Sequence, residues 1–137
     1  MIVLDTNIVS ALMKPLDNPH VPAWLNQWPE GEIRTTSITI MEISYGIERL
    51  PFGRKRHELS ESFYMLRHQY LKEILAFDQA AASFTSTILA NAHSAGRNLD
   101  IPDTEIAGIA LAHDATLATR NVKDFEGLGV RLVNPWG

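Results

Sequence analysis

Short apolar runs alternate along this chain with longer stretches of helical period, and this alternation restricts the fold more than any other feature. The runs lie at about 2–4, 33–36, 74–77, 117–119 and 130–133. Helical patterns separate them, over about 7–14, 19–28, 37–50, 55–70, 78–95 and 103–113. Strands joined by helices pair in parallel, because each helix returns the chain to the same end of the sheet. We therefore expect an α/β fold of three layers, α/β/α, around a central, mostly parallel sheet of about five strands, formed by one domain over residues 1–137.

Residues that cap or stop helices mark the ends of these predicted helices. Ser37 and Asp78 are candidate N-caps, because a short polar side chain there accepts a hydrogen bond from a free backbone N–H. Gly96 is placed to close the long helix that Asp78 opens. Asp103 follows Pro102 and is expected at the start of its helix.

The composition excludes several kinds of protein. The chain has no cysteine, so neither a disulfide framework nor a thiolate zinc site is available, and a reducing cytoplasm suits it. Met1 leads directly into a strand, and no apolar run approaches the roughly 20 residues of a membrane span, so we expect no signal peptide and no membrane contact. The net charge of −4 is unlike that of domains that hold nucleic acid by bulk electrostatics, although a nuclease that binds phosphate through a metal remains compatible with it.

Four acidic residues fall close to predicted strand ends. Asp5 ends the first strand, Glu42 lies one turn into the helix after the second, Asp103 begins the helix before the fourth, and Asp124 follows that fourth strand. At least Asp5, Glu42 and Asp124 should share the carboxyl edge of the sheet, where open parallel sheets bind ligands. Carboxylates crowded there would repel one another unless a cation joined them. Oxygen ligands without cysteine favour Mg²⁺ or Mn²⁺ over zinc.

Each of these acids also has a structural interpretation. Asp5 and Asp103 are suited to cap helices, and with 16 acids in the chain some would end strands by chance. Glu42 is harder to explain in this way, because it interrupts an apolar stretch from Ile38 to Ile43 and a carboxylate at the rim of a core requires a partner. Spacing alone leaves both interpretations open.

Four stretches, in order, carry a family resemblance. They are Leu4-Asp5-Thr6-Asn7, the segment 37–46 (SITIMEISYG), the segment 102–107 (PDTEIA) and the segment 119–125 (TRNVKDF), with the closing GVRLVNPW adding to them. With these motifs the chain resembles PIN-domain proteins, specifically the VapC-type toxin ribonucleases of bacterial type II toxin–antitoxin pairs and, among them, the FitB-like branch. The resemblance covers nearly the whole chain.

The resemblance implies a set of site residues. Asp5, Glu42, Asp103 and Asp124 would hold Mg²⁺, with Mn²⁺ as the other candidate, and hydrogen bonds from Asn7 and Thr119 would support them. Asp100 is a rival to Asp103, but it lies upstream of Pro102 and outside the predicted helix start.

The sequence departs from the family pattern at three positions of the same segment. Thr104 and Gly108 stand where the family generally has alanine, and Glu105 stands where it has an apolar residue. Glu105 should point about 200° around the helix from Asp103, outside the site. None of these changes removes an expected metal ligand.

The implied reaction is metal-dependent hydrolysis of RNA phosphodiester bonds, and the implied partners are a cognate antitoxin, operator DNA reached through that antitoxin, and a second copy in a homodimer. Arg120 and Lys123 are the candidates for binding RNA phosphates. The dense basic cluster, Arg49 and 54–57, either follows an RNA backbone or is a solvated helix start. Four apolar residues, Leu12, Met13, Trp24 and Trp28, belong either to the core or to a groove for an antitoxin helix.

Two rival functions remain in view. A phosphohydrolase of the haloacid-dehalogenase type also places Asp after its first strand, but its chemistry requires a second acid two residues on, where this chain has Asn7. The other rival is a PIN scaffold that acts mainly as an antitoxin-bound co-repressor. Four intact acids favour an active nuclease over that scaffold.

Overall fold

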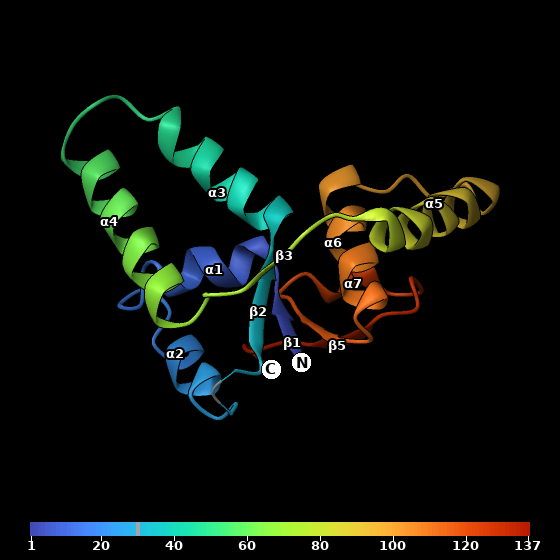
Figure 1. Ribbon diagram of the computed structural model, residues 1–137, viewed down its shortest axis with the longest axis horizontal. Coiled ribbons are helices and arrows are strands. Elements are labelled where there is room, and N and C mark those ends of the chain that lie inside the picture. Colours follow the sequence, from blue (N-terminus) through green and yellow to red (C-terminus); the bar gives the residue numbers. More distant parts are fainter. Residues whose placement is uncertain (30) are drawn as a thin grey trace.

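The computed structural model describes residues 1–29 and 31–137, and its strands and helices alternate as the sequence predicts (Figure 1). The strands are β1 (Ile2–Leu4), β2 (Ile33–Thr36), β3 (Ile74–Leu75), β4 (Thr116–Ala118) and β5 (Arg131–Val133). The helices are α1 (Thr6–Leu12), α2 (His20–Leu25), α3 (Ser37–Glu48), α4 (Arg54–Gln69), α5 (Gln79–Ser94), α6 (Ile101–Ala112) and α7 (Val122–Phe125). None of the described helices combines the length and apolar character that a membrane span requires.

The strands form one sheet in the order β3-β2-β1-β4-β5, and every pair in it is parallel. From β1 the chain moves outward through β2 to β3, and it then returns to the other side of β1 for β4 and β5. The order therefore reverses between β1 and β4, which is where parallel sheets of this kind bind ligands. Asp5 and Thr119, the residues that follow these two strands, leave the sheet at that point.

Side chains of the central strand alternate between the two faces of the sheet. Ile2 and Leu4 belong to the core that the sheet forms with α1, α2, α3 and α4, whereas Val3 belongs to the core formed with α5, α6 and α7. Figure 1 shows these two groups of helices on opposite sides of the sheet. The expected three-layer arrangement with a parallel sheet is confirmed.

Two predicted boundaries around β2 and β3 were wrong because side-chain hydroxyl groups compete for backbone N–H groups there. Thr36, not Ser37, caps α3, since the Oγ1 of Thr36 accepts a hydrogen bond from the backbone N–H of Thr39 at 3.2 Å. Ser37 instead accepts the backbone N–H of Phe77 at 3.2 Å. That N–H is therefore not available to extend β3, which ends at Leu75.

The start of α6 also differs from the prediction. Asp100 is its N-cap and accepts the backbone N–H of Asp103 at 3.0 Å, so the helix begins two residues earlier than expected and Asp103 lies in its first turn. The predicted cap at Asp78 is confirmed, since its carboxylate accepts the N–H of Ala81 at 3.0 Å. The four-residue α7, which holds Asp124, was missed.

Helices α5 and α6 pack closely at Gly108. A Cβ atom at this position would overlap the hydroxyl of Thr85 and lie 2.8 Å from the carbonyl oxygen of Ala81. Glycine rather than alanine at position 108 is therefore explained by Thr85 opposite it. The tight contact fixes α6, and with it Asp103, against α5.

Candidate active site

Asp5 acts both as the residue that ends β1 and as the N-cap of α1. Its Oδ1 accepts the backbone N–H of Ile8 at 3.0 Å, and the side chain is buried. Burial raises the pKa of this carboxyl group, hydrogen bonds from the side chain of Thr119 and the backbone of Ile8 lower it, and the charge of Glu42 raises it further. Asp5 therefore caps α1 and at the same time lies close enough to Glu42 for the two charges to interact.

Glu42 projects from α3 into a small network of threonine hydroxyl groups. The Oγ1 of Thr6 donates to Glu42 Oε1 at 2.6 Å, and the same Oγ1 lies 3.1 Å from Oγ1 of Thr39. The partner expected for a carboxylate at the core rim is thus Thr6, a residue that sequence reasoning missed. Its position directly after Asp5, at the start of α1, was the one available signal.

Asp103 and Asp124 face a cavity of about 230 Å³ between α6, α7 and the segment that precedes α6. Asp100, the cap of α6, lines the same cavity. The pKa of Asp103 is raised to about 7, first by burial and then by the negative charges of four other acids, Asp100, Asp5, Glu42 and Asp124. The structure therefore brings the four acids singled out from the sequence within electrostatic reach of one another, and it adds Asp100.

The donor chemistry of this group fits a divalent cation. No described lysine or arginine forms an ion pair with Asp5, Glu42, Asp103 or Asp124, although Arg97 lines the same cavity as Asp103 and Asp124. Arg97 approaches α7 but donates only to backbone carbonyl groups, including that of Asp124 at 3.1 Å. In the described conformation no three Asp, Glu or His side chains converge closely enough to ligate one ion. Hard oxygen donors with a raised pKa are nonetheless the groups that Mg²⁺ would relieve.

The two predicted supporting residues lie on either side of Asp5. Thr119 is fully buried after β4, and its Oγ1 also accepts the backbone N–H of Asn121 at 3.0 Å. Asn7 is exposed and lines a different cavity, next to α1. Thr119 therefore bonds to Asp5, while Asn7 lines a cavity that Asp5 does not line.

The two predicted phosphate-binding residues are in different places. Arg120 lines the same cavity as Asn7, on the α1 side of the acids. Lys123 lies exposed on α7, and its backbone carbonyl accepts a hydrogen bond from Arg97 at 3.3 Å. Lys123 does not line the cavity that holds Arg120.

The dense basic cluster is held by contacts of its own at the start of α4. Arg54 pairs with Glu58 at 2.8 Å, and Arg56 donates to the carbonyl groups of Glu48 and Leu50. These contacts are those of a solvated helix start. Figure 1 shows this connection at the end of α3 that is distant from the sheet.

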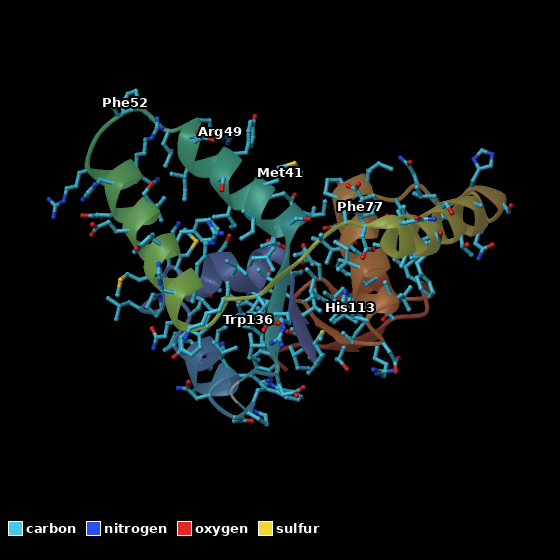
Figure 2. The ribbon with its side chains drawn as sticks, in the orientation of Figure 1. Met41, Arg49, Phe52, Phe77, His113 and Trp136 are labelled. Atoms are coloured by element: carbon cyan, nitrogen blue, oxygen red, sulfur yellow. The ribbon has the colours of Figure 1, made fainter. Side chains whose placement is uncertain are left out.

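The four apolar residues with two interpretations lie in or against the core. Leu12 and Met13 are buried, and Trp24 and Trp28 pack on the same cluster with their ring centroids 5.9 Å apart. Five of the large exposed apolar side chains are instead on α3, α4 and their connection, and others include Leu16, Phe84 and Ile101. Met41, Tyr45, Phe52, Tyr64 and Met65 are each more than half exposed, and Figure 2 shows Met41 and Phe52 at the outer side of this helical pair.

Comparison with known proteins gives a consistent set of similarities. A model of the PIN domain matches residues 2–129. Toxin FitB of Neisseria gonorrhoeae is 32% identical over 137 residues, with 99% of each chain covered. VapC ribonuclease Y4jK of Sinorhizobium fredii is 31% identical over 140 residues, which cover 99% of this chain and 98% of the relative. The solved structure of FitAB bound to an IR36 DNA fragment superimposes with a TM-score of 0.89 at 32% identity, covering 100% of this chain and 96% of that one.

Proposed function

The chain belongs to the PIN-domain family, and from that premise we propose that it is the toxin of a toxin–antitoxin pair and a Mg²⁺- or Mn²⁺-dependent endoribonuclease. One observation carries the proposal. Four carboxylates, from the end of β1 and from α3, α6 and α7, have no described cation paired to them, and burial together with the charges of the other acids raises the pKa of Asp103 to about 7. A relative named as a VapC ribonuclease supports the choice of RNA as substrate.

Asp5, Glu42, Asp103 and Asp124 would hold the metal. When bound, the ion supplies positive charge that binds the scissile phosphate, lowers the pKa of a water molecule and offsets charge on the leaving oxygen. Attack of water on phosphorus with rupture of the P–O3′ bond leaves a 5′-phosphate and a 3′-hydroxyl. Mn²⁺ suits the same oxygen donors.

Residues of the chain set the geometry of these acids. The cap that Asp5 makes to Ile8 fixes its carboxylate at the strand end. The hydroxyl of Thr6 orients Glu42, and the side chain of Thr119 bonds to Asp5 from β4. Each of these contacts keeps a carboxylate in place before any cation arrives, which lowers the cost of ordering the site on binding.

We also propose a cognate antitoxin as partner, operator DNA reached through it, and a homodimer. The solved FitAB–DNA complex supports the first two, and the exposed apolar side chains of α3 and α4 offer a protein-binding surface. A weak nuclease that acts mainly as an antitoxin-bound co-repressor is the alternative that the same DNA complex favours. Four acids without counter-charge speak against it, because a scaffold gains nothing from their repulsion.

The test is cleavage of labelled RNA by the purified chain, free of any partner, with Mg²⁺ or Mn²⁺ and then with EDTA. We expect cleavage that depends on metal and falls by at least about 100-fold in Asp5→Asn and in Asp103→Asn. Glu105→Gln is the matched control, since Glu105 lies on the same helix as Asp103 but is not among the charges that act on it. Calorimetric metal titration of each variant runs beside the cleavage assay.

The outcomes separate the two functions. Cleavage lost in both aspartate variants and kept in Glu105→Gln supports the nuclease. Metal binding without cleavage on a broad RNA panel would restrict the proposal to a very narrow substrate. Absence of both metal binding and cleavage would overturn the nuclease and leave the co-repressor.

A further inference from the structure

A second cavity is lined by residues that follow Asp5 and Thr119 closely in sequence. Its volume is about 550 Å³, and it lies between α1 and the segment that follows β4. The residues that matter in it are Asn7, Lys14, Asn18, Arg120, Asn121 and Trp136, and we call it the basic groove. Asn7 is two residues beyond Asp5, and Asn121 is two residues beyond Thr119, so the groove begins where the acidic site ends.

The basic groove carries positive charge, whereas the acidic site carries negative charge. Lys14 and Arg120 are its charged residues, and no carboxylate lines it, although the chain as a whole has a net charge of −4. Neither side chain forms an ion pair or a hydrogen bond with any described residue. Arg97 and Arg131, by contrast, are bonded to carbonyl or carboxylate oxygens. Lys14 and Arg120 therefore have no ion-pair or hydrogen-bond partner among the described residues and are available to bind an anion from solution.

Arg120 is held in place without using its hydrogen-bond donors. Its guanidinium lies 4.7 Å from the ring centroid of Trp136, a cation–π contact that fixes the group while its N–H bonds remain free of described acceptors. His20 approaches the same indole edge-on, with ring centroids 6.4 Å apart. Figure 2 labels Trp136, which follows the last strand, β5. The groove wall thus carries planar groups beside a positive charge.

We propose that the basic groove binds the single-stranded RNA that adjoins the cleaved bond, with Lys14 and Arg120 on its phosphates and Trp136 beside a base. The inference rests on the proposed nuclease function and deepens it. Cations bind any phosphate backbone, whereas an aromatic face gains contact only from bases that are unstacked, as in single strands and loops. The amide side chains of Asn7, Asn18 and Asn121 add donors and acceptors of the kind that read base edges.

An acidic protein segment fits the groove less well. It would use Lys14 and Arg120, and its backbone could bond to the amide side chains, but acidic side chains offer no flat surface to the indole. The position of the groove also favours RNA, because Asn7 follows Asp5 by two residues and a strand bound at Asp5 can continue into the groove. Lys123 does not line this groove.

The experiment measures binding separately from cleavage. A fluorescein-labelled oligouridine of about 12 nucleotides, within the span of single-strand binding sites, is titrated by anisotropy into the Asp5→Asn protein at several salt concentrations. Asparagine is also a good N-cap, so this background retains the cap of α1. Lys14→Gln, Arg120→Gln and Trp136→Leu are added one at a time, and circular dichroism melting checks that each variant folds.

Matched controls come from the same chain. Lys72→Gln removes an exposed lysine that lines a different cavity, with Gln69 and Glu73. Arg67→Gln removes an arginine that also lies over an aromatic ring, 5.5 Å from the centroid of Phe63, on the distant helix α4. Both controls should bind the oligouridine within about twofold of the parent, since exposed charges outside a contact change affinity little.

We expect Lys14→Gln and Arg120→Gln each to weaken binding by about 3- to 10-fold and to reduce the log–log salt slope by about 0.7–1. Trp136→Leu should weaken binding by about 5- to 100-fold without changing that slope. A fully paired RNA duplex should lose less affinity than the oligouridine in Trp136→Leu.

The results distinguish this inference from the proposed function. If the wild type cuts RNA but all three groove variants bind like the parent, the groove assignment is wrong and the nuclease stands. If no metal supports cleavage while the groove variants lose binding, the groove stands and the nuclease fails. If the variants lose binding to an oligo-aspartate peptide and keep that to RNA, the occupant is a protein segment and the inference is overturned.

Discussion

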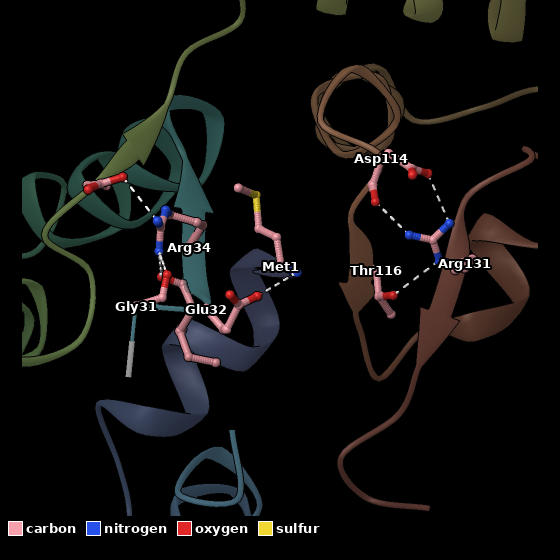
Figure 3. A network of polar contacts seen from close by, with 9 residues as sticks. Met1, Gly31, Glu32, Arg34, Asp114, Thr116 and Arg131 are labelled. Atoms are coloured by element: carbon pink, nitrogen blue, oxygen red, sulfur yellow. Dashed lines mark hydrogen bonds and ion pairs between the residues drawn. The ribbon is translucent and has the colours of Figure 1, made fainter. Parts of the chain in front are cut away.

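Acidic residues at the two edges of the sheet differ in whether a cation is paired with them. At the amino edge, where the strands begin, three of the described acids have a cation beside them (Figure 3). The pairs are Glu32 with the amino group of Met1 at 2.8 Å, Glu73 with Arg34 at 3.1 Å, and Asp114 with Arg131 at 3.0 Å. At the carboxyl edge, the four acids of the candidate site have no paired cation in the described part of the chain.

The pKa values record this difference. The hydrogen bond to the amino group of Met1 lowers the pKa of Glu32, while burial and four neighbouring carboxylates raise that of Asp103 to about 7. The same kind of group therefore favours its charged form at one edge and resists it at the other. The unpaired acids of the carboxyl edge support the proposed cation site there. At the amino edge, the described acids Glu32, Glu73 and Asp114 are already paired with cations of the chain.

The largest effect on stability is expected from a substitution that moves α6 away from α5. Gly108→Ala should destabilise the protein by about 3 kcal/mol, because the added methyl group meets the hydroxyl of Thr85 and a backbone carbonyl that cannot move freely. Asp103 shifts with α6, so its pKa should fall toward the usual range. Urea unfolding and carboxyl-carbon NMR titration measure the two effects.

Gly46→Ala is the matched control, since Gly46 also lies within a 12-residue helix, α3, but has no atom within 4 Å of the added carbon. It should stabilise the protein by up to about 1 kcal/mol through helix propensity alone. Thr85→Ala in the Gly108→Ala background should recover part of the loss. Equal urea midpoints for Gly108→Ala and wild type would show that α5 and α6 are not closely packed.

Removing one charge from the carboxyl edge should separate stability from activity. Asp103→Asn is expected to lose cleavage yet to raise the melting temperature of the metal-free protein at pH 8 by about 2–4 °C. That shift corresponds to no more than about 1 kcal/mol, because the side chain stays partly in solvent, which screens its repulsion. Scanning calorimetry in EDTA measures it, with Asp114→Asn as the amino-edge control. A lower melting temperature for Asp103→Asn would mean that this carboxylate is paired and not repelled.

The pH dependence of stability should have opposite signs at the two edges. The folded pKa of Asp103, about 7, lies above its usual value of 3.8, so the folded state binds the extra proton between these limits. The metal-free protein should therefore lose this contribution as the pH rises from about 4 to about 7, by linkage. Glu32, whose pKa is lowered, contributes stability above its usual range and loses it as the pH falls through the lowered value.

Melting temperatures from pH 5 to pH 8 in EDTA test this linkage over most of its window, about 4 to 7. Saturating Mg²⁺ should flatten or reverse the decline, because the cation favours the ionised carboxylates. Asp103→Asn should remove most of the decline without metal. A decline that persists unchanged in this variant would assign it to other groups.

The smallest effect is expected from the exposed pairs of the amino edge. Arg131→Met should change the unfolding free energy by less than about 0.5 kcal/mol, because solvent screens the pair with Asp114. Cleavage should not change, since the pair lies at the opposite end of the sheet. Urea unfolding at two salt concentrations checks this, and a loss above about 1 kcal/mol would contradict it.

The sequence predicted strands and helices correctly where a hydrophobic pattern runs over several residues. It failed where one side-chain contact sets the end of an element. Apolar runs placed four of the five strands within about one residue and missed the end of β3 by two, which is the usual limit of boundary reasoning. The predicted strand end at Phe77 failed because the hydroxyl of Ser37 takes its N–H, a contact between residues 40 apart in sequence. Helix α7 was missed because four residues are too short to show a helical period.

The residues of the candidate site also fall into those that the sequence could predict and those that it could not. Acids at strand ends could be predicted to gather, because topology alone brings strand ends together, and the structure places them in one environment. Thr6 and Trp136 could not be predicted, since their roles depend on partners that only the folded chain supplies, Glu42 for one and Arg120 for the other. Whether the acids bind metal remains a proposal.

The pairing of β1 has a consequence for the order in which the protein becomes functional during its own synthesis. Ile2, among the first residues made, pairs with Thr116 as well as with Ile33, so the central strand keeps one open edge until most of the chain has left the ribosome. Contacts of such long sequence separation form late. The acids at positions 5 and 124 therefore cannot meet on an incomplete chain, and under the proposed function a growing polypeptide has no assembled site with which to cut the message that encodes it.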